Sequence, residues 1–549
     1  MKIIKVIGIV CLMCLWLSAA YSKAGERDLA KVMADHLQCY PLEILSFEEQ
    51  NPIIIKKSVC LAAIYHKSGA EPLWVSEKGP GERAAIILKY LRNAGNEGLN
   101  PADYQVKKIE RQWADLSLNS LAELDTLLTY NMVKYIHDVS YGQLKPYMVN
   151  PKLFAEAGER GFDPLKMVET IRKTEDLEAF FQSLPPQHRQ YMGLKNALIQ
   201  YSGMKYSGLW QKEILRKSIR PGDEDEKIIE IKKRIALLEN AGVESLTTDN
   251  LSLFDDDLMK KMIRFQLNNG LEPDGIIGPK TMRELNKSPQ ERLDQIKVNM
   301  TRWRWHDHTL GDKYILVNIA NYRLFAYETD KLKFSMPVIV GELQNQTPVF
   351  SDKIKYLELN PYWNMPPSIA KNEELPKLRK NPNYLVNKNI RLFSNWQKDG
   401  VEIDSTVIDW NAVTPSQMAG FKLRQDPGPA NALGRVKFVF PNQYFVYLHD
   451  TPSKKLFSRQ TRSFSHGCIR VSEPEKLAAF LLNEKDNKWD RERVNHLINL
   501  GKRKVLKIRP TIPIHITYQT AWVDKNGQIN FNGDVYRRDE KLYQALFIK

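Results

Sequence analysis

The sequence predicts a multidomain α+β protein, helical in its first half and β-rich in its second. Its 549 residues are too many for a single hydrophobic core, so three or four domains are expected. Apolar residues recur at three- and four-residue spacing from 27 to about 220, and they alternate with polar ones from 312 onward. Charged residues make up 26% and hydrophobic residues 43% of the chain, as in ordinary globular proteins.

The N-terminus has the layout of a secretory signal peptide. Lys2 and Lys5 precede an apolar run that ends at Leu17, and a stretch of mostly small residues follows as far as Ala24. The run is short for a membrane-spanning helix, so we expect residues 1–24 to be a cleaved signal, with a retained anchor as the alternative.

The number of cysteines predicts one thiol without a disulfide partner. Without residues 1–24 the chain keeps Cys39, Cys60 and Cys468. In an oxidising compartment Cys39 and Cys60 form the natural pair, and a disulfide between them would contribute about 3 kcal/mol if unstrained. Cys468 is then the unpaired cysteine.

The helical region, residues 27–220, is expected to be a structural scaffold. Its clearest helical patterns are RAAIILKYLRNAG at 83–95 and LDTLLTYNMVKYIHDVS at 124–140. No catalytic combination of residues appears in this region.

A small helical module is expected at 221–290, after the Pro-Gly and acidic stretch RPGDEDEK. Leu258, Met262 and Phe265 share one face of its first strong helix. Gly270 is placed to end that helix in a left-handed conformation, because glycine has no Cβ to oppose it.

A β-rich domain is expected at 300–510. The segments 313–328 and 436–451 alternate apolar and polar residues as strands do. The stretch 362–434, rich in Pro, Asn and Lys, is too long for a structureless loop, so we expect an insertion that covers a site. Residues 511–549 form a tail expected to pack on the scaffold or on the β-rich domain.

Cys468 combines with two residues upstream into a candidate for cysteine catalysis. Tyr447 and His449 project from one face of a predicted strand, because strand side chains alternate. A thiol needs a base to become a nucleophile, and an imidazole can take its proton and return it to a leaving amine. We therefore expect Cys468 as nucleophile and His449 as base, with Tyr447 beside them.

The segment around the cysteine, SFSHGCIRVS at 463–472, adds supporting groups. Gly467 would let main-chain amides approach an oxyanion, and Arg470 offers a planar fork for a substrate carboxylate. Ser472 and Glu475 form a capping box that predicts a helix, which puts Cys468 on a turn between a loop and that helix. The full set of residues expected to contact substrate is Arg470, His466, Ser465 and, from the insertion, Trp363.

The motif SHGCIR with a histidine nineteen residues before the cysteine resembles the L,D-transpeptidase (YkuD-domain) family, whose core motif is [ST]-H-G-C. Many members have Asn where this chain has Arg470. The resemblance therefore does not by itself give the role of Arg470. Residues 256–286 resemble the peptidoglycan-binding-domain-1 family. The order of scaffold, binding module, catalytic domain and capping insertion is similar to the large periplasmic YcbB-type branch.

The resemblance implies a reaction in the periplasm that needs no cofactor. Cys468 would attack a tetrapeptide stem of peptidoglycan, release D-alanine and form a thioester. A diaminopimelate amine from a second stem would then complete a 3-3 cross-link. The resemblance also implies acylation by carbapenem inhibitors and, as a possible partner, a D,D-carboxypeptidase that supplies tetrapeptides.

Other readings remain open from the sequence. The same thioester could be hydrolysed, which would make an L,D-carboxypeptidase or endopeptidase, and a lipoprotein lysine could replace the second stem as acceptor. A non-catalytic wall-binding scaffold is a further possibility. A zinc site of His449, His466 and Cys468 lacks a fourth ligand, and Cys468 could also be a buried structural residue.

Nucleic acid is not the expected partner despite a net charge of +15. Basic and acidic residues are interleaved along the whole chain instead of forming one basic patch. A carboxylate-rich substrate or a polyanionic envelope accounts for the same excess of positive charge.

Overall fold

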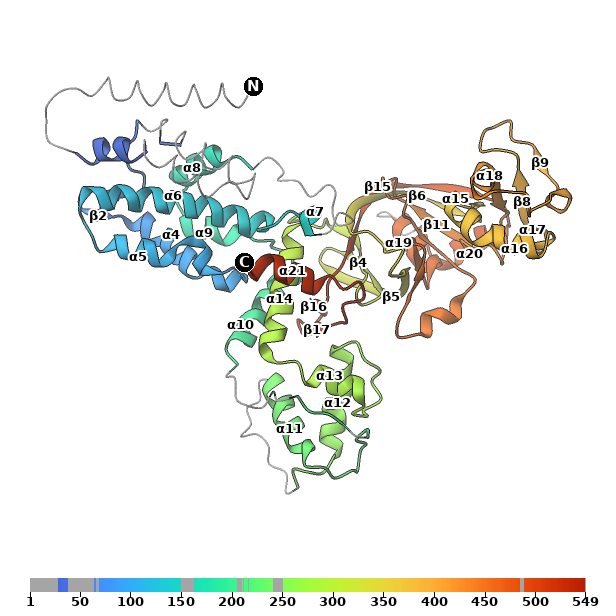
Figure 1. The fold of residues 1–549 in the computed structure, drawn as a ribbon, viewed down its shortest axis with the longest axis horizontal. Coiled ribbons are helices and arrows are strands. Elements are labelled where there is room, and N and C mark those ends of the chain that lie inside the picture. The colour runs from blue at the N-terminus through green and yellow to red at the C-terminus, as the bar shows by residue number, and fades with distance from the viewer. Residues whose placement is uncertain are drawn as a thin grey trace.

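A computed structural model shows three regions: a helical region, a small helical module and a large β-sheet domain (Figure 1). This confirms the predicted multidomain α+β organisation. The signal peptide and the Cys39–Cys60 pair lie outside the described residues. No helix in the described part is both long and apolar enough to cross a bilayer. The structure describes residues 28–37, 64–65, 69–149, 162–204, 210, 212–215, 217–239, 250–483 and 488–548.

The helical region surrounds one long helix, α6 (Leu118–Tyr141), which begins at the Ser117 cap. Buried residues lie on all sides of α6, so it forms the centre of a core that extends from Leu29 to Leu184. The other elements of this region are β1 (Val75–Ser76), β2 (Gly79–Pro80), α4 (Glu82–Arg92), α5 (Val106–Trp113), α7 (Pro146–Val149), α8 (Pro164–Lys173) and α9 (Leu177–Ser183), with 3₁₀ turns at Ala94–Glu97 and Pro101–Tyr104.

Helix α10 (Arg189–Ser202) lies within the predicted scaffold but packs elsewhere. It runs beside α14 (Pro289–Arg304), and both share a core with strands of the large sheet and with the hairpin β16 (Ala521–Val523) and β17 (Ile529–Phe531). Gln190 donates a hydrogen bond to the carbonyl of Val523 at 2.7 Å. The last scaffold helix therefore joins the helical region to the rest of the molecule.

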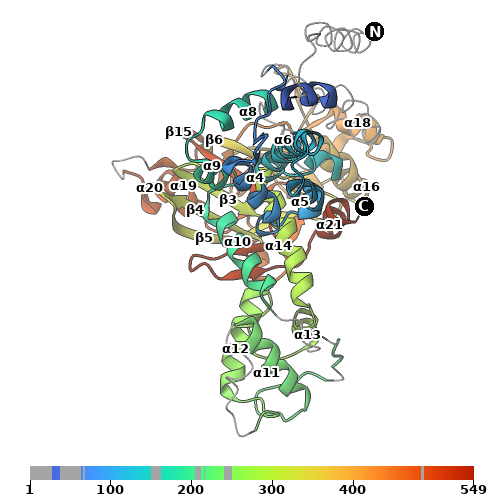
Figure 2. The same cartoon turned by 90° about the vertical axis from the view of Figure 1, so that its left-hand side faces the viewer.

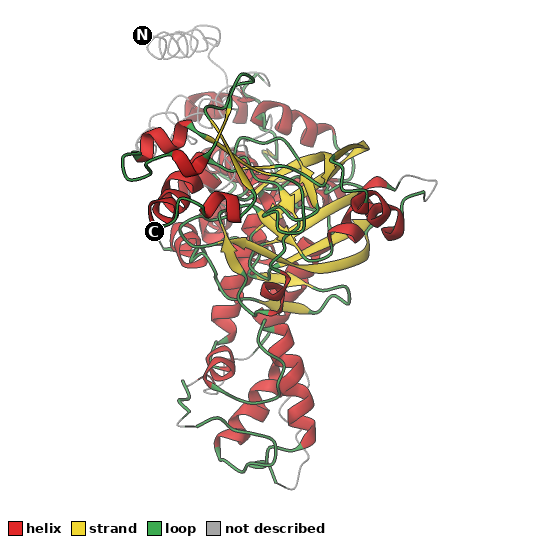
Figure 3. Cartoon of the chain, turned by 90° about the vertical axis from the view of Figure 1, so that its right-hand side faces the viewer, coloured by secondary structure: helices red, strands yellow, loops and turns green. Residues whose placement is uncertain are grey.

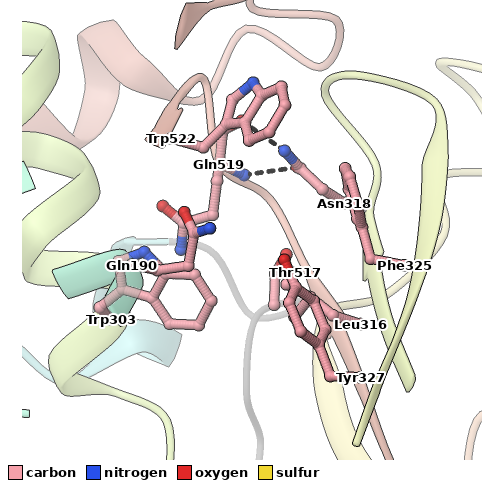
Figure 4. Close-up of a pocket in the computed structure, with 9 residues that line it drawn as sticks. All are labelled: Gln190, Trp303, Leu316, Asn318, Phe325, Tyr327, Thr517, Gln519 and Trp522. Atoms are coloured by element: carbon pink, nitrogen blue, oxygen red, sulfur yellow. Dashed lines mark hydrogen bonds between the residues drawn. The ribbon is translucent and has the colours of Figure 1, made fainter. Parts of the chain in front are cut away.

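A small cavity marks this junction (Figure 4). Gln190 and Trp303 approach it from α10 and α14, and Asn318 and Gln519 exchange two hydrogen bonds of 2.9 Å at its other side. Its volume of about 10 Å³ is enough for one water molecule. The Nε2 and Oε1 atoms of Gln519 are buried and have no hydrogen-bond partner in the described chain, as a water site would require.

The helical module is inserted between α10 and α14 and projects away from the rest (Figures 1 and 2). It consists of α11 (Lys227–Leu238), α12 (Asp256–Asn268) and α13 (Pro279–Leu285). The predicted apolar face of α12 is buried, and Gly270 has the predicted left-handed φ of 64°. Gln460, from the sheet domain, donates to the Gly270 carbonyl at 3.1 Å and accepts from Lys280 at 3.2 Å.

The sheet domain is built on nine strands in the order β13-β5-β14-β12-β11-β6-β15-β3-β4. Figure 3 shows this sheet in yellow with helices around it. Strand β15 (Lys504–Thr517) lies between β6 and β3, so it continues across the boundary expected at 510. The first part of the predicted tail is thus a central strand, not a packed appendage. The remaining elements are β3 (Lys313–Asn318), β4 (Arg323–Glu328), β5 (Lys331–Gly341), β6 (Phe350–Leu359), β11 (Val436–Val439), β12 (Leu448–His449), β13 (Ser463–Ser465), β14 (Ile469–Val471), α19 (Pro474–Leu482), α20 (Arg491–Asn499) and α21 (Asp539–Phe547).

The insertion at 362–434 folds as a unit with its own core. Its sheet has the order β7-β10-β8-β9, and Trp410 is buried among its apolar residues. The bounds are β7 (Trp363–Asn364), α15 (Pro367–Ile369), a π-helical turn (Ala370–Glu374), α16 (Leu375–Lys380), α17 (Tyr384–Asn387), β8 (Ile390–Phe393), β9 (Glu402–Ile403), α18 (Pro415–Gly420) and β10 (Lys422–Gln425).

Candidate active site

Cys468 lies between strands β13 and β14, directly before Ile469. The prediction of a turn between a loop and a helix is therefore wrong, because a strand separates the cysteine from α19. The expected capping box is also absent: α19 begins after Glu473 without a side-chain cap, and the buried Ser472 hydroxyl has no partner. Cys468 is the free cysteine of the described chain and is partly exposed.

The parallel pairing of β12 with β14 brings His449 to the strand that follows the cysteine. Strand β12 contains only Leu448–His449, so Tyr447, expected on the same strand, directly precedes it and interacts with the Cys468 thiol. In this register Leu448 lies opposite Ile469 and His449 opposite Arg470, and the Ile469 amide donates to the Tyr447 carbonyl at 3.1 Å. The ring Nδ1–H of His449 donates to the Asp450 carbonyl at 2.6 Å. That bond fixes the tautomer and leaves Nε2 with a free lone pair, as a general base needs.

Burial favours the uncharged forms of both groups. It lowers the pKa of His449 to about 3, helped by the nearby positive charges of Arg470 and Lys437. It also raises the pKa of the Cys468 thiol, while Tyr447, Lys437 and Arg470 act in the opposite direction. The resting site is thus a neutral thiol beside a neutral imidazole.

Lys437 belongs to the site although the sequence analysis did not select it. It lies in β11 opposite His449, and its ammonium group is 4.1 Å from the centre of the Tyr447 ring. Burial lowers the pKa of Lys437, and the Cys468 thiolate favours its charged form. The signal was available: Lys437 interrupts two buried residues, Val436 and Phe438, and so faces the same side as the site.

The loop before the cysteine is held by its own hydrogen bonds. The Ser465 hydroxyl donates to the Cys468 carbonyl at 2.5 Å and accepts from the Gly467 amide at 3.2 Å. Because Ser465 is buried and its hydroxyl is used here, we assign it to loop shape instead of substrate contact. Gly467 has φ of 112°, which favours glycine, and its amide is already engaged.

A threonine from the β5–β6 connection supports this loop from behind. Thr347 is fully buried, donates to the Gly467 carbonyl at 2.8 Å and accepts from the Gly341 amide at 2.9 Å. Tyr536 of the C-terminal tail donates to the Gly341 carbonyl at 2.6 Å. The tail therefore contributes to the position of the cysteine.

Arg470 is the cation best placed for a substrate carboxylate. Its guanidinium is half-buried and forms no hydrogen bond or ion pair with the described residues, and its buried Nε atom has no partner. Burial lowers its pKa, which the Cys468 thiolate opposes. A carboxylate ligand would satisfy a group that the protein leaves unpaired.

His466 connects the motif to the insertion. Its Nε2 atom lies 2.5 Å from a carboxylate oxygen of Glu373, in the π-helical turn. Trp363 pairs with Gln425 in the insertion sheet and packs against the insertion core. His466 thus lies at the contact between catalytic loop and insertion, whereas the described contacts of Trp363 are internal to the insertion.

Phe445 is a second residue that the sequence analysis missed. Its side chain is 85% exposed, its φ is 54°, and its carbonyl is 3.9 Å from the Cys468 sulfur.

No group of three or more His, Cys, Asp or Glu side chains in the described residues is arranged to hold a metal ion.

Three family models match separate parts of the chain. Residues 312–502 match the L,D-transpeptidase catalytic domain (YkuD), 225–285 the "Putative peptidoglycan binding domain", and 60–198 the Scaffold domain. Residues 312–502 therefore belong to the YkuD L,D-transpeptidase family, joined in one chain to a scaffold domain and a peptidoglycan-binding domain.

A curated relative, "Putative L,D-transpeptidase" of Haemophilus influenzae, is 35% identical over 231 residues. The match covers 42% of this chain, and the chain spans only 45% of that relative's length. Among solved structures, an L,D-transpeptidase from Mycobacterium smegmatis is 12% identical over 38% of this chain and 58% of its own, with a TM-score of 0.17. An LD transpeptidase in complex with imipenem is 13% identical over 38% and 59%, with a TM-score of 0.18.

Proposed function

We propose that this protein is an exported L,D-transpeptidase that forms 3-3 cross-links between the stem peptides of peptidoglycan. The observation that carries the proposal is the set of basic and hydrogen-bonding groups around Cys468. The Cys468 thiol lies near Tyr447, Lys437 and Arg470, and the strand paired with β14 supplies His449, whose tautomer leaves Nε2 free as a base.

The first half-reaction forms a thioester. His449 Nε2 takes the thiol proton as Cys468 Sγ attacks the carbonyl carbon at the L-centre of diaminopimelate in a tetrapeptide stem. Because both groups are neutral at rest, this proton transfer accompanies the attack and does not precede it. The C–N bond then breaks, the histidine returns the proton to the leaving amine, and D-alanine departs.

The second half-reaction forms the cross-link. The side-chain amine of a second stem's diaminopimelate attacks the thioester, loses a proton to His449 and restores the thiol. Lys437 and Arg470 provide positive charge close to the sulfur while it is anionic. Arg470 is assigned to a carboxylate of the stem, and carbapenems are expected to acylate Cys468 in place of the donor.

Export to the periplasm rests on the N-terminal Lys2–Ala24 pattern and on the location of the substrate. A D,D-carboxypeptidase that trims pentapeptides would supply the tetrapeptide donor.

The test is incubation of the purified chain, and of a Cys468→Ala variant, with disaccharide-tetrapeptide, followed by mass spectrometry of products and protein. The expected result is a mass adduct on the Cys468 peptide, free D-alanine and dimers with a 3-3 bond, all absent from the variant.

Two other results would change the assignment. Tripeptide and D-alanine without dimers would indicate an L,D-carboxypeptidase. A folded protein that gives neither adduct nor product, and that no carbapenem acylates, would leave a wall-binding scaffold.

A further inference from the structure

One row of side chains crosses the sheet at the level of Cys468, on the face that points away from the core. The strand pairing places Arg470 opposite His449, and His449 opposite Lys437. On its other side Lys437 lies opposite Glu358 of β6, in an antiparallel pair whose Cβ atoms are typically about 4.5–5.5 Å apart. The row therefore continues one strand beyond the residues assigned to the reaction, and its next member is an acid.

Glu358 is held in place by Arg503, which directly precedes β15. The Nε and Nη2 atoms of Arg503 lie 3.0 and 2.8 Å from the same carboxylate oxygen, Oε2 of Glu358. The Glu358 side chain is 13% exposed, so solvent screens its charge less than the charge of an open surface pair. The carboxylate thus lies between two cations, Arg503 on one side and Lys437 on the other.

Lys437 has no ion-pair partner of its own among the described residues. Its ammonium group lies over the Tyr447 ring and forms no hydrogen bond within the described chain. Burial lowers the pKa of Lys437, whereas the Glu358 carboxylate raises it. The Cys468 thiolate also raises this pKa, and Arg503 lowers it. While the thiol is protonated, Glu358 is therefore the group that favours the ammonium form of Lys437.

The charged and titratable groups that face Lys437 come from the strands on both sides of it. They are Tyr447 and His449 at β12, Cys468 and Arg470 at β14, Glu358 in β6 and Arg503 before β15. Within this set Glu358 is the one carboxylate. Without its charge, Lys437 would lie between two guanidinium groups.

The charge on Lys437 acts on the sulfur. Burial raises the pKa of the Cys468 thiol, and Lys437 and Arg470 are the charged groups that lower it. Glu358 lies one strand further from the cysteine than Lys437, so its direct repulsion of a thiolate is weaker than the attraction from the ammonium group. Its main effect on the thiol therefore passes through Lys437.

We propose that Glu358 and Arg503 are positioning residues that set the charge on Lys437 and, through it, the reactivity of Cys468. Glu358 favours the ammonium form, whereas Arg503 opposes it, both directly and by neutralising Glu358. The two members of one ion pair therefore act on the thiol with opposite signs. Their importance for cross-linking rests on the proposed function, whereas their control of the thiol does not.

The first experiment follows the ammonium group directly in the full chain. Trace acetylation with acetic anhydride from about pH 7 to about pH 10.5, read by peptide mass spectrometry, gives the titration of Lys437. Relative to the parent protein, Glu358→Gln should move this titration to lower pH and Arg503→Gln to higher pH. Glu358→Asp keeps the charge, so its titration should lie closer to that of the parent than the titration of Glu358→Gln.

The double variant of Glu358→Gln and Arg503→Gln separates charge from structure. An ion pair that only supports the fold would give the same displacement in both single variants, because either change breaks it. Charge control instead predicts opposite displacements that largely cancel in the double variant. The control Glu110→Gln, which breaks the exposed pair with Arg92 in the helical region, should leave the titration unchanged.

The second experiment measures alkylation of Cys468 by iodoacetamide at the pH where Lys437 is half-charged in the parent protein. Glu358→Gln should slow the reaction about twofold, because fewer molecules carry the ammonium charge, and Arg503→Gln should accelerate it. In a Lys437→Met background, Glu358→Gln should no longer slow the reaction.

The inference fails if both single variants move the Lys437 titration in the same direction, or if neither moves it. It also fails if Glu358→Gln slows alkylation equally in the Lys437→Met background. Neither experiment uses a peptidoglycan substrate, so these outcomes reject only the charge control. The expected titrations in a protein that releases no D-alanine from tetrapeptide would reject only the transpeptidase.

Discussion

At the scale of single residues, the main feature is the opposition between burial and charge around Cys468. Burial keeps the thiol and the His449 ring neutral, whereas Lys437 and Arg470 favour a thiolate. The same two cations oppose protonation of the histidine. The site is therefore arranged so that negative charge on sulfur is stabilised only as it develops.

Replacement of Lys437 by methionine should slow the reaction of Cys468 with iodoacetamide at pH 7.5 by roughly three- to tenfold, because loss of the nearby charge lowers the thiolate fraction. The rate is measured by intact-mass spectrometry over time. Lys455→Met, at an exposed lysine of the 3₁₀ turn Lys454–Ser458, is the matched control. An unchanged rate in Lys437→Met would mean that its charge does not act on the sulfur.

Sequence reasoning found the residues that belong to a contiguous pattern and missed those that the fold brings in. Cys468 and Gly467 stand in one motif, and His449 and Tyr447 are two residues apart in one alternating segment. Glu373 is 93 residues before His466 in the sequence, so only the folded insertion shows that the two meet. Ser465 was misassigned because a motif does not reveal which hydroxyl its own backbone uses.

At the scale of elements, the catalytic loop is held between the β5–β6 connection and the insertion. Thr347 supports it from the buried side, and Glu373 contacts it from the exposed side. The Thr347 contact is fully buried and the Glu373 contact is at the surface, so the first should contribute more to the free energy of unfolding.

Thr347→Val should lower both stability and acylation. The change keeps the shape but leaves the Gly467 carbonyl and the Gly341 amide without their partner, which costs about 1–3 kcal/mol for each buried group. We expect a lower Tm and a several-fold slower carbapenem acylation. Thr347→Ser, which retains the hydroxyl, should recover most of the acylation rate; if it does not, the methyl packing is what matters.

Glu373→Gln should loosen the insertion with little effect on global stability. Both side chains of the Glu373–His466 pair are more than a third exposed, and such pairs contribute about 0–1 kcal/mol. Hydrogen exchange should increase in the π-helical turn and the loop 463–468. Glu402→Gln, which breaks the pair with Arg391 inside the insertion, should leave exchange in 463–468 unchanged. Equal effects of the two variants would contradict a specific contact.

The strands and helices with strong periodicity were predictable, whereas their pairing was not. Helix α6 follows from its local pattern, whereas within the predicted strand segment 436–451 only Val436–Val439 and Leu448–His449 are strands. The parallel pairing of β12 with β14, which places Cys468 beside Tyr447, joins residues 21 positions apart without a sequence signal. The continuation of β15 past 510 was missed because Pro510 and Pro513 interrupt its pattern.

At the scale of the whole molecule, buried histidines make stability depend on pH. His188, His449 and His515 lie in different parts of the fold, and burial lowers their pKa values to about 3, 3 and 4. In the unfolded chain each would titrate near 6.5. Between pH 6.5 and 4 the unfolded state binds protons that the folded state does not, so stability falls as the pH decreases.

The prediction is tested at His515, whose ring interacts with the Leu310 carbonyl at 2.9 Å and with the Ser351 hydroxyl at 2.8 Å. Glutamine can make both bonds but does not titrate. From pH 7.5 to 5.0 one such histidine costs about 2 kcal/mol. In urea unfolding, His515→Gln should therefore lose about 2 kcal/mol less than the parent protein over this interval. An equal loss would show that His515 is protonated in the folded state.

The amide of Gln460 has a consequence for how the helical module and the catalytic loop can move. It connects the helical module, through Gly270 and Lys280, to the segment that leads three residues later into strand β13 and the cysteine motif. Only residues 286–288 separate α13 from α14, which shares a core with strands of the large sheet. A displacement of the module would therefore break the two Gln460 bonds or move the residues that lead into the cysteine motif. The module and the catalytic loop are in this way mechanically coupled.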